Sequence, residues 1–131
     1  MTDRTAAEPE RLLPLPHLTY LVLLALARES GHGWAIIKRI REITGGETNP
    51  STGSLYLAMI RLEERGLLEE VAAPAPATDE RRRYYRLTAF GRRVLEAESA
   101  RLAGLVREAS RLGVRGAGGR GTPSKPARGG A

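Results

Sequence analysis

The stretch NPSTGSLYLAMIRLEERGLLEE, residues 49–70, carries the clearest structural signals in the sequence. Pro50 precedes two hydroxyl residues, Ser51 and Thr52, and either hydroxyl can cap the first turn of a helix. Apolar residues then recur at the spacing of one helical face: Leu55, Ala58, Met59 and Leu62. Gly66 predicts the end of this helix, because glycine readily adopts the backbone conformation found after a helix C-terminus.

The sequence after this helix predicts a β-hairpin with a long tip. Residues 67–71 and 83–87 are short runs of the kind that form strands. The segment between them, AAPAPATDERR at 72–82, is rich in proline and charge and therefore predicts a loop. We expect the two strands to pair with each other.

Two helices are predicted before residue 49. Apolar residues fill two faces of LTYLVLLALARES, residues 18–30, so we expect this helix to be covered on two sides. One cover would be the chain's own domain, and the other either the C-terminal helix or a second subunit. The second helix is GWAIIKRIREIT, residues 33–44, with Ile36, Ile37, Ile40 and Ile43 expected inward and Lys38, Arg39, Arg41 and Glu42 outward. The pair Gly45-Gly46 predicts its end.

A long helix is predicted over residues 88–112, with Thr88 as its N-cap. Its apolar residues follow a repeat of about 3.5 residues, and they are Leu95, Leu102, Leu105, Ala109 and Leu112. Glu98 is the one polar interruption. A helix of this length spans roughly 37 Å, which is long for so small a body. We therefore expect it to pack against a second copy of the chain as well.

Three helices, two strands and a long helix follow one another in the order of a winged helix-turn-helix protein, whose third helix enters the major groove of DNA. The predicted fold class is mainly α with a small β-hairpin as the wing. The expected parts are a flexible N-terminal segment at 1–16, a winged helix-turn-helix DNA-binding domain at 17–87, a C-terminal dimerisation helix at 88–112 and a disordered Gly/Arg-rich basic tail at 113–131.

Composition excludes several classes of protein. The chain has 131 residues, which suits one domain, and no Cys, so a disulfide scaffold, a thiolate zinc site and a cysteine nucleophile are excluded. Its two His residues are far apart, and no metal site or cofactor is expected. The serines lack a His–Asp arrangement and no phosphate-binding loop follows a strand, so we expect no enzyme.

The same sequence gives no sign of membrane insertion or export. Its longest apolar run, Tyr20 to Ala27, is far shorter than the roughly 20 residues of a membrane-spanning helix. The first 16 residues mix acidic and basic residues and are interrupted by prolines, unlike a signal peptide. We therefore expect a cytoplasmic protein without a membrane partner.

The net charge of +6 is unevenly distributed along the chain. Residues 113–131 hold four basic residues and no acidic one, which leaves a net charge of +2 for residues 1–112. The tail has too few apolar side chains to bury, and this predicts disorder. It is interpreted first as a solubilising extension, and alternatively as a non-specific tether to nucleic acid.

Three segments resemble a known family, the PadR family of transcriptional regulators. They are HGWAIIKRIREITGG at 32–46, STGSLYLAMIRLEERGLLEE at 51–70 and RRYYRLTAFGRRVLE at 82–96. The resemblance covers about residues 17–98, with all three motifs in the family's order and spacing. It implies a homodimer held by the first and last helices that binds an inverted repeat, usually as a repressor. With a single helix after the wing, the chain resembles the short subfamily.

The sequence departs from the family pattern at several positions. Trp34 stands where the family has Tyr, and Thr52 and Leu57 stand where it has Pro. Phe90 stands near a position that is often Glu, and the wing tip lacks the family's Gly-Arg-Pro sequence. The wing departure leaves open whether this loop contacts the minor groove or the DNA backbone.

The candidate DNA-binding residues are Ser51, Thr52, Gly53, Ser54, Tyr56, Arg61, Lys38, Arg81, Arg82 and Arg83. A helix N-terminus suits phosphate oxygens, and short hydroxyls can also reach base edges. The resemblance places Tyr56 on the family's tyrosine in this motif. The alternatives are simple capping for the hydroxyl residues, a core aromatic for Tyr56 and merely solvated cations for the basic residues. Asp79 and Glu80 would weaken the field of the three arginines that follow them.

The candidate dimerisation residues are Leu21, Leu24, Leu95, Leu102, Leu105 and Ala109. Trp34 is the candidate for a small-molecule effector pocket, although a single Trp at a helix start is more often a core or interface residue. His32 begins the second helix, and a capping or packing role is favoured over a phosphate contact or a pH-sensitive group.

The leading hypothesis is therefore a homodimeric, sequence-specific repressor of transcription that binds double-stranded DNA. A small-molecule effector that releases it from DNA is compatible with the sequence, but nothing identifies the ligand. The alternative is a winged-helix adaptor that binds a protein through its third helix, because fold alone does not establish function.

Overall fold

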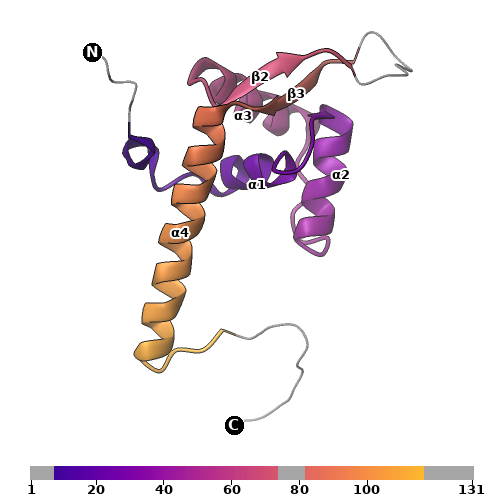
Figure 1. The fold of residues 1–131 in the computed structure, drawn as a ribbon. Helices are drawn as coiled ribbons and strands as arrows, with labels where there is room; N and C mark the ends of the chain where they lie inside the picture. The colour runs from indigo at the N-terminus through magenta and orange to yellow at the C-terminus, as the bar shows by residue number, and fades with distance from the viewer. Residues whose placement is uncertain (1–7, 74–81, 117–131) are drawn as a thin grey trace. The chain divides into compact units, whose positions relative to one another are not determined.

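Residues 8–73 and 82–116 are described by a computed structural model of the chain, which Figure 1 shows as a ribbon. The elements in these ranges are η2 (Pro9–Leu12), α1 (His17–Ala25), β1 (Gly31–His32), α2 (Gly33–Ile43), α3 (Thr52–Glu64), β2 (Leu68–Val71), β3 (Tyr84–Leu87) and α4 (Ala89–Arg111). The predicted fold class, a winged helix-turn-helix with a long last helix, is confirmed. The predicted wing tip and most of the predicted tail lie outside the described residues.

The chain divides into two compact units, with a boundary between Ser99 and Ala100. The first unit holds the hydrophobic core and every element from η2 to the first part of α4. The second unit begins within α4. The candidate site lies entirely in the first unit.

The core of the first unit forms where α1 packs against both α2 and α3 (Figure 1). The sequence predicts that α1 is apolar on two faces, and the cover expected from its own domain is provided by α2 and α3. α2 and α3 each contribute one apolar stripe. The fully buried side chains include Val22, Leu23, Ile36, Ile40, Leu55, Met59 and Leu67. This packing fixes which face of α3 remains at the surface.

The sheet has three antiparallel strands in the order β1-β3-β2. The predicted hairpin is confirmed, with Leu68 opposite Leu87 and Val71 opposite Tyr84. The sequence did not predict β1, in which His32 pairs with Tyr84. A strand of two residues is too short to show an alternating pattern. β1 attaches the start of α2 directly to the wing.

Two expectations about α2 were wrong. Ile43 was expected inward, but its side chain is 47% exposed, because it lies in the last turn of the helix, beyond the core. Arg39 was expected outward, but it folds back and donates hydrogen bonds to the carbonyl oxygens of Ala25 (3.1 Å) and Ser30 (3.0 Å). Arg39 thereby holds the turn between α1 and α2, which periodicity alone does not reveal.

The N-terminal segment has structure that the sequence did not predict. Residues 9–12 form the 3-10 helix η2, and Leu12, Leu13 and Leu15 pack against the core. The backbone N–H of Leu15 donates a hydrogen bond of 3.0 Å to Glu98, whose side chain is only 2% exposed. The polar interruption noted in the last helix is therefore a buried acceptor that ties the segment to α4.

Four backbone segments meet where α3 ends and α4 begins. Gly66 leaves α3 with φ of 82°, and the hydroxyl of Thr88 donates a hydrogen bond of 2.6 Å to its carbonyl. The Thr88 N–H donates to the Leu67 carbonyl at 3.0 Å, and the Gly91 N–H donates to the Thr88 hydroxyl at 2.9 Å. Thr88 is thus the predicted N-cap of α4, and it also closes the base of the hairpin. We call this set of contacts the hairpin junction.

Gly91 is required at the hairpin junction. A Cβ atom at this position would collide with the backbone carbonyl oxygen of Leu67. The colliding atom belongs to the main chain, so the clash cannot be relieved by rotation of a side chain.

In the described part of the chain, no helix is long and apolar enough to span a membrane.

We expect Gly91→Ala to lower the free energy of unfolding by about 1–3 kcal/mol, because the new methyl group overpacks the backbone of Leu67. Gly53→Ala is the matched control: it also lies in a helix, but a Cβ there meets no atom within 4 Å. The control should be neutral or stabilising by up to about 1 kcal/mol. Urea unfolding followed by circular dichroism measures both. Equal stability of Gly91→Ala and the parent would contradict the close approach.

Candidate nucleic-acid interface

The first turn of α3 is exposed and capped. Ser51 is the N-cap, and its hydroxyl oxygen accepts a hydrogen bond of 3.1 Å from the Ser54 N–H. The Ser51 hydroxyl also donates to the Ser54 hydroxyl at 3.0 Å. The capping interpretation is therefore confirmed for Ser51, while Thr52, Gly53 and Ser54 lie exposed at the surface. Three hydroxyl side chains and one glycine face the solvent at the start of this helix.

The outward face of α3 continues with large side chains. Leu57 and Ile60 are each 51% exposed, and Tyr56 is 44% exposed. These residues lie opposite or beside the buried stripe of Leu55 and Met59, so the packing of the core directs them to the surface. Sequence reasoning did not select Leu57 or Ile60 as site residues, because apolar residues in a helix are usually assigned to the core.

A hollow of about 770 Å³ separates α3 from the start of α2 and the hairpin. Its lining residues are His32, Gly33, Trp34, Tyr56, Ile60, Glu63, Arg82, Arg83 and Tyr85. A Cβ at Gly33 would lie only 2.7 Å from the Tyr56 hydroxyl oxygen, so the glycine allows this hydroxyl to approach α2. The hollow brings together Tyr56, Arg82 and Arg83, three of the predicted DNA-binding residues from two separate elements.

A second hollow of about 880 Å³ lies along the exposed side of α2. Trp34, Lys38, Arg41 and Arg82 are among the residues that line it. The indole of Trp34 is 63% exposed, so of the favoured core or interface interpretation the core role was wrong, whereas the interface role stays a prediction. Its position in the first turn of α2 leaves the ring beyond the reach of the apolar stripe of that helix.

Arg61 lies on a different side of α3 from these basic residues. It lines a smaller hollow of about 270 Å³ together with Ser54, Leu57 and Leu12 of the N-terminal segment. Lys38 and Arg61 therefore line separate hollows rather than forming one cluster.

Acidic residues partly balance the charge of the hairpin. Arg86 forms an ion pair with Glu69 at 2.8 Å, and Arg83 lies 4.0 Å from Glu70, each across the two strands. These side chains are largely exposed, so each pair contributes little to stability. The pairs still reduce the positive field over β2 and β3. The predicted contact residue Arg81 lies outside the described residues.

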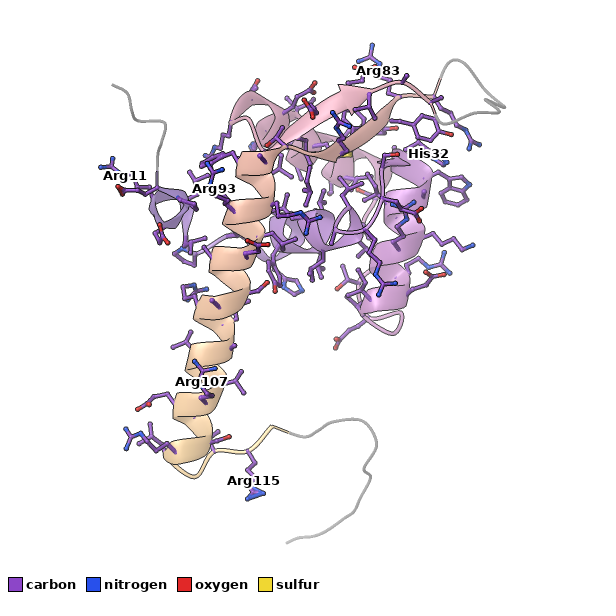
Figure 2. All side chains as sticks on the ribbon, viewed as in Figure 1. Arg11, His32, Arg83, Arg93, Arg107 and Arg115 are labelled. Atoms are coloured by element: carbon purple, nitrogen blue, oxygen red, sulfur yellow. The ribbon has the colours of Figure 1, made fainter. Side chains whose placement is uncertain are left out.

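His32 lies between α2 and the hairpin, whereas Arg83 lies on the hairpin itself (Figure 2). The Nδ1 atom of His32 accepts a hydrogen bond of 3.2 Å from the Ala35 N–H. His32 is therefore the N-cap of α2, as the capping interpretation predicted. Its ring meets the Tyr84 ring edge-on, with 5.2 Å between the centroids. Its Nε2 atom lies 3.0 Å from Nη1 of Arg82.

Three effects lower the pKa of His32 from its usual value of 6.5. The largest is partial burial, followed by the positive charges of Arg82 and Arg39. The folded protein therefore takes up a proton at this ring less readily than the unfolded chain does. The resulting contribution to stability is complete above the unfolded pKa and is lost as the pH falls through the folded pKa.

We expect the parent protein to lose stability between about pH 7.5 and about pH 5.5 more steeply than His32→Asn does. Asparagine can still cap α2 but does not titrate in this range. Urea unfolding at both pH values measures the difference between the two proteins. The same pH dependence in the two proteins would contradict a lowered pKa for His32.

The predicted dimerisation residues fall into two groups. Leu21 and Leu95 are buried in the chain's own core, so their burial requires no second copy. Leu24 is half-buried against that core. In α4, Leu102 and Ala109 are half-buried and Leu105 is 55% exposed.

No group of three or more His, Cys, Asp or Glu residues suited to a metal ion occurs among residues 8–73 and 82–116.

Comparison with known proteins places the chain among regulators of transcription. A model of the transcriptional regulator PadR-like family matches residues 22–97. An uncharacterized 37.1 kDa protein in transposon TN4556 of Streptomyces fradiae is 40% identical over 93 residues, which are 69% of this chain. The chain spans about a quarter (25%) of the length of that curated relative.

Solved structures share the fold. A PadR family transcription regulator from hypervirulent Clostridium difficile is 25% identical with a TM-score of 0.65, over 74% of this chain and 98% of that one. The PadR family transcriptional regulator of Eggerthella lenta is 33% identical with a TM-score of 0.56, over 72% and 80% of the two chains. RosR of H. salinarum is 28% identical with a TM-score of 0.56, over 78% and 87%.

The family match covers the end of α1, all of α2 and α3, the hairpin and the first part of α4, and these include the elements that build the surface described above. The chain belongs to the PadR-like family of transcriptional regulators.

Proposed function

We propose that the chain is a homodimeric repressor that binds double-stranded DNA at an inverted repeat. The observation that carries this proposal is the outward face of α3, which presents Ser54, Tyr56 and Leu57 while its opposite face is fixed in the core. Basic residues lie beside this face: Arg82 lines one hollow next to α3 and Arg61 lines another, while Lys38 lies on the exposed side of the neighbouring α2. A helix with these features suits insertion into a major groove between two phosphate backbones.

Each part of this surface has a separate role in the proposal. The hydroxyl residues at the start of α3 and the basic residues contact phosphates and fix the position of the protein on DNA. The exposed side chains of Leu57 and Ile60 suit apolar contact with thymine methyl groups, and the Ser54 hydroxyl suits base edges. We therefore expect most of the affinity from phosphates and most of the specificity from α3.

The proposed dimer uses the exposed apolar residues of α4. Leu105, Val106 and Leu112 are 55%, 66% and 67% exposed, and a second copy would remove these side chains from water. Leu102 and Ala109 belong to the same repeat of about 3.5 residues, which is the spacing of helices that pack side by side. A dimer would place two α3 helices on one face of the duplex, about one helical turn apart.

We propose Trp34 as the contact for a small-molecule effector. Its exposed indole shares a hollow with Lys38 and Arg41, which suits a flat ligand with a negative charge. Because Arg82 lines the same hollow, such a ligand would compete with DNA for this arginine. Trp34 is the single tryptophan of the chain, so its fluorescence reports binding directly. An effector that releases DNA without changing this fluorescence would exclude the site.

No catalytic activity is part of this proposal, and the protein would act in the cytoplasm, where it meets the DNA.

The rival is a protein-binding adaptor, which the exposed Leu57 and Ile60 would also suit. Selection of fragments of the source genome by the purified protein, near physiological salt, separates the two functions. We expect one enriched inverted repeat, bound by two chains and preferred over scrambled DNA by ~10³ or more. Equal affinity for both DNAs, lost at moderate salt, would favour the adaptor.

We expect Ser54→Ala and Tyr56→Phe each to weaken binding to the selected repeat by roughly tenfold, because each loses one hydroxyl that contacts DNA. Tyr56→Phe keeps the ring that approaches Gly33, so the fold should be unchanged. Arg93→Gln is the control, since this exposed cation lies on α4 (Figure 2) and is not among the residues that line the three hollows described above. Fluorescence anisotropy gives the affinities and analytical ultracentrifugation the dimer. Parental affinity of both hydroxyl variants would contradict the assigned contacts.

A further inference from the structure

The ring of His32 faces two hydrogen-bond donors at once. The backbone N–H of Ala35 donates to Nδ1 at 3.2 Å, and this bond caps α2. On the other side of the ring, Nη1 of Arg82 lies 3.0 Å from Nε2. A guanidinium nitrogen carries hydrogens only and has no acceptor, so Arg82 can only donate toward the ring.

One imidazole ring cannot accept from both donors. A neutral ring has one acceptor nitrogen and one N–H group, and a protonated ring has two N–H groups. If Nδ1 accepts from Ala35, the hydrogen is on Nε2 and points at the guanidinium. If Nε2 accepts from Arg82 instead, the hydrogen is on Nδ1 and α2 loses its cap. The free protein therefore cannot satisfy both contacts at the same time.

An anionic oxygen beside both groups removes this conflict. It accepts from Nε2–H and from the guanidinium together, while Nδ1 keeps its bond to Ala35. We propose that His32 and Arg82 jointly bind one non-bridging phosphate oxygen of the DNA backbone. This inference rests on the proposed DNA-binding function, and it assigns a phosphate contact to a residue for which the sequence favours a capping or packing role over such a contact.

The position of the pair favours a DNA phosphate over a small anion. His32 and Arg82 both line the hollow between α3 and the hairpin, and Tyr56 and Arg83 line it as well. α3 is proposed to enter a major groove, which is bordered by DNA backbones, and the hairpin residue Arg82 lies beside α3 in this hollow. Glu63 also lines the hollow and repels anions, so the site needs the positive charge of its arginines.

His32 and Arg82 contribute to the affinity for DNA in different ways. At about pH 8 the ring is neutral, because burial and the nearby arginines lower the pKa of His32. It therefore contributes a hydrogen bond and releases no counterion. Arg82 is charged and releases about one counterion when it binds a phosphate. The dependence of affinity on salt thus separates the two contributions.

The test uses the full-length protein, the selected inverted repeat and a scrambled duplex, with affinities measured over a salt series at about pH 8. His32→Asn keeps an acceptor for the cap but loses the Nε2–H donor. We expect it to weaken binding to both duplexes by roughly tenfold without a change in salt slope. Arg82→Gln should reduce the salt slope by about one, and Arg93→Gln should have neither effect.

The double variant His32→Asn/Arg82→Gln tests whether the two residues hold the same oxygen. Shared contact predicts that the double variant loses less affinity than the product of the two single losses. The proposal would be overturned if the affinity loss of the double variant equals the product of the two single losses, or if His32→Asn binds DNA with parental affinity. Because phosphate contacts do not depend on base sequence, the affinity losses of the three variants can be measured on the scrambled duplex too. Equal affinity for the two duplexes would instead refute the proposed sequence-specific function.

A measurement on the parent protein covers the case in which His32→Asn fails to fold. Nitrogen-15 chemical shifts of the His32 ring distinguish a protonated from an unprotonated nitrogen. With DNA bound, we expect the hydrogen on Nε2 and a bare Nδ1. A hydrogen on Nδ1 in the complex would overturn the proposal, since the ring could not then donate to the phosphate from Nε2.

Discussion

The position of the wing relative to α3 depends on the hairpin junction, where Thr88 bonds to the carbonyls of Gly66 and Leu67. The end of α3, both strands and the start of α4 meet there. Because Gly91 has no side chain, α4 can approach the backbone of Leu67 closely enough to close the junction. β1 provides a second connection, since it joins the start of α2 to β3. The hollow between α3 and the hairpin is the consequence of these two connections.

Local signals predicted most of the fold. The cap residue Ser51, the end of α3 at Gly66 and the long helix after Thr88 follow from chemistry within a few residues, so the sequence shows them. Arg39, β1 and the buried Glu98 were missed because their partners lie elsewhere in the chain. The exposure of Ile43 was missed because periodicity does not show where the core ends.

The candidate site was predicted less completely than the fold. The structure brings Tyr56, Arg82 and Arg83 together in one hollow, but it also places Arg83 4.0 Å from Glu70 across the hairpin. Such a pairing depends on strand register, which the long loop leaves undefined in the sequence. For His32 the favoured capping role is confirmed, and the structure adds that its second ring nitrogen faces Arg82. A capping residue with two ring nitrogens was the signal that could have indicated this contact.

The central claim is that α3, the start of α2 and the base of the hairpin form a single DNA-binding surface. Mapping of amide chemical shifts in the labelled protein during titration with the selected duplex tests it most directly. We expect the largest changes at residues 51–57, 32–35 and 82–84, which lie in or directly beside the segments that line the hollows around α3. Binding of the duplex with the largest changes confined to α1 and α4 would contradict it.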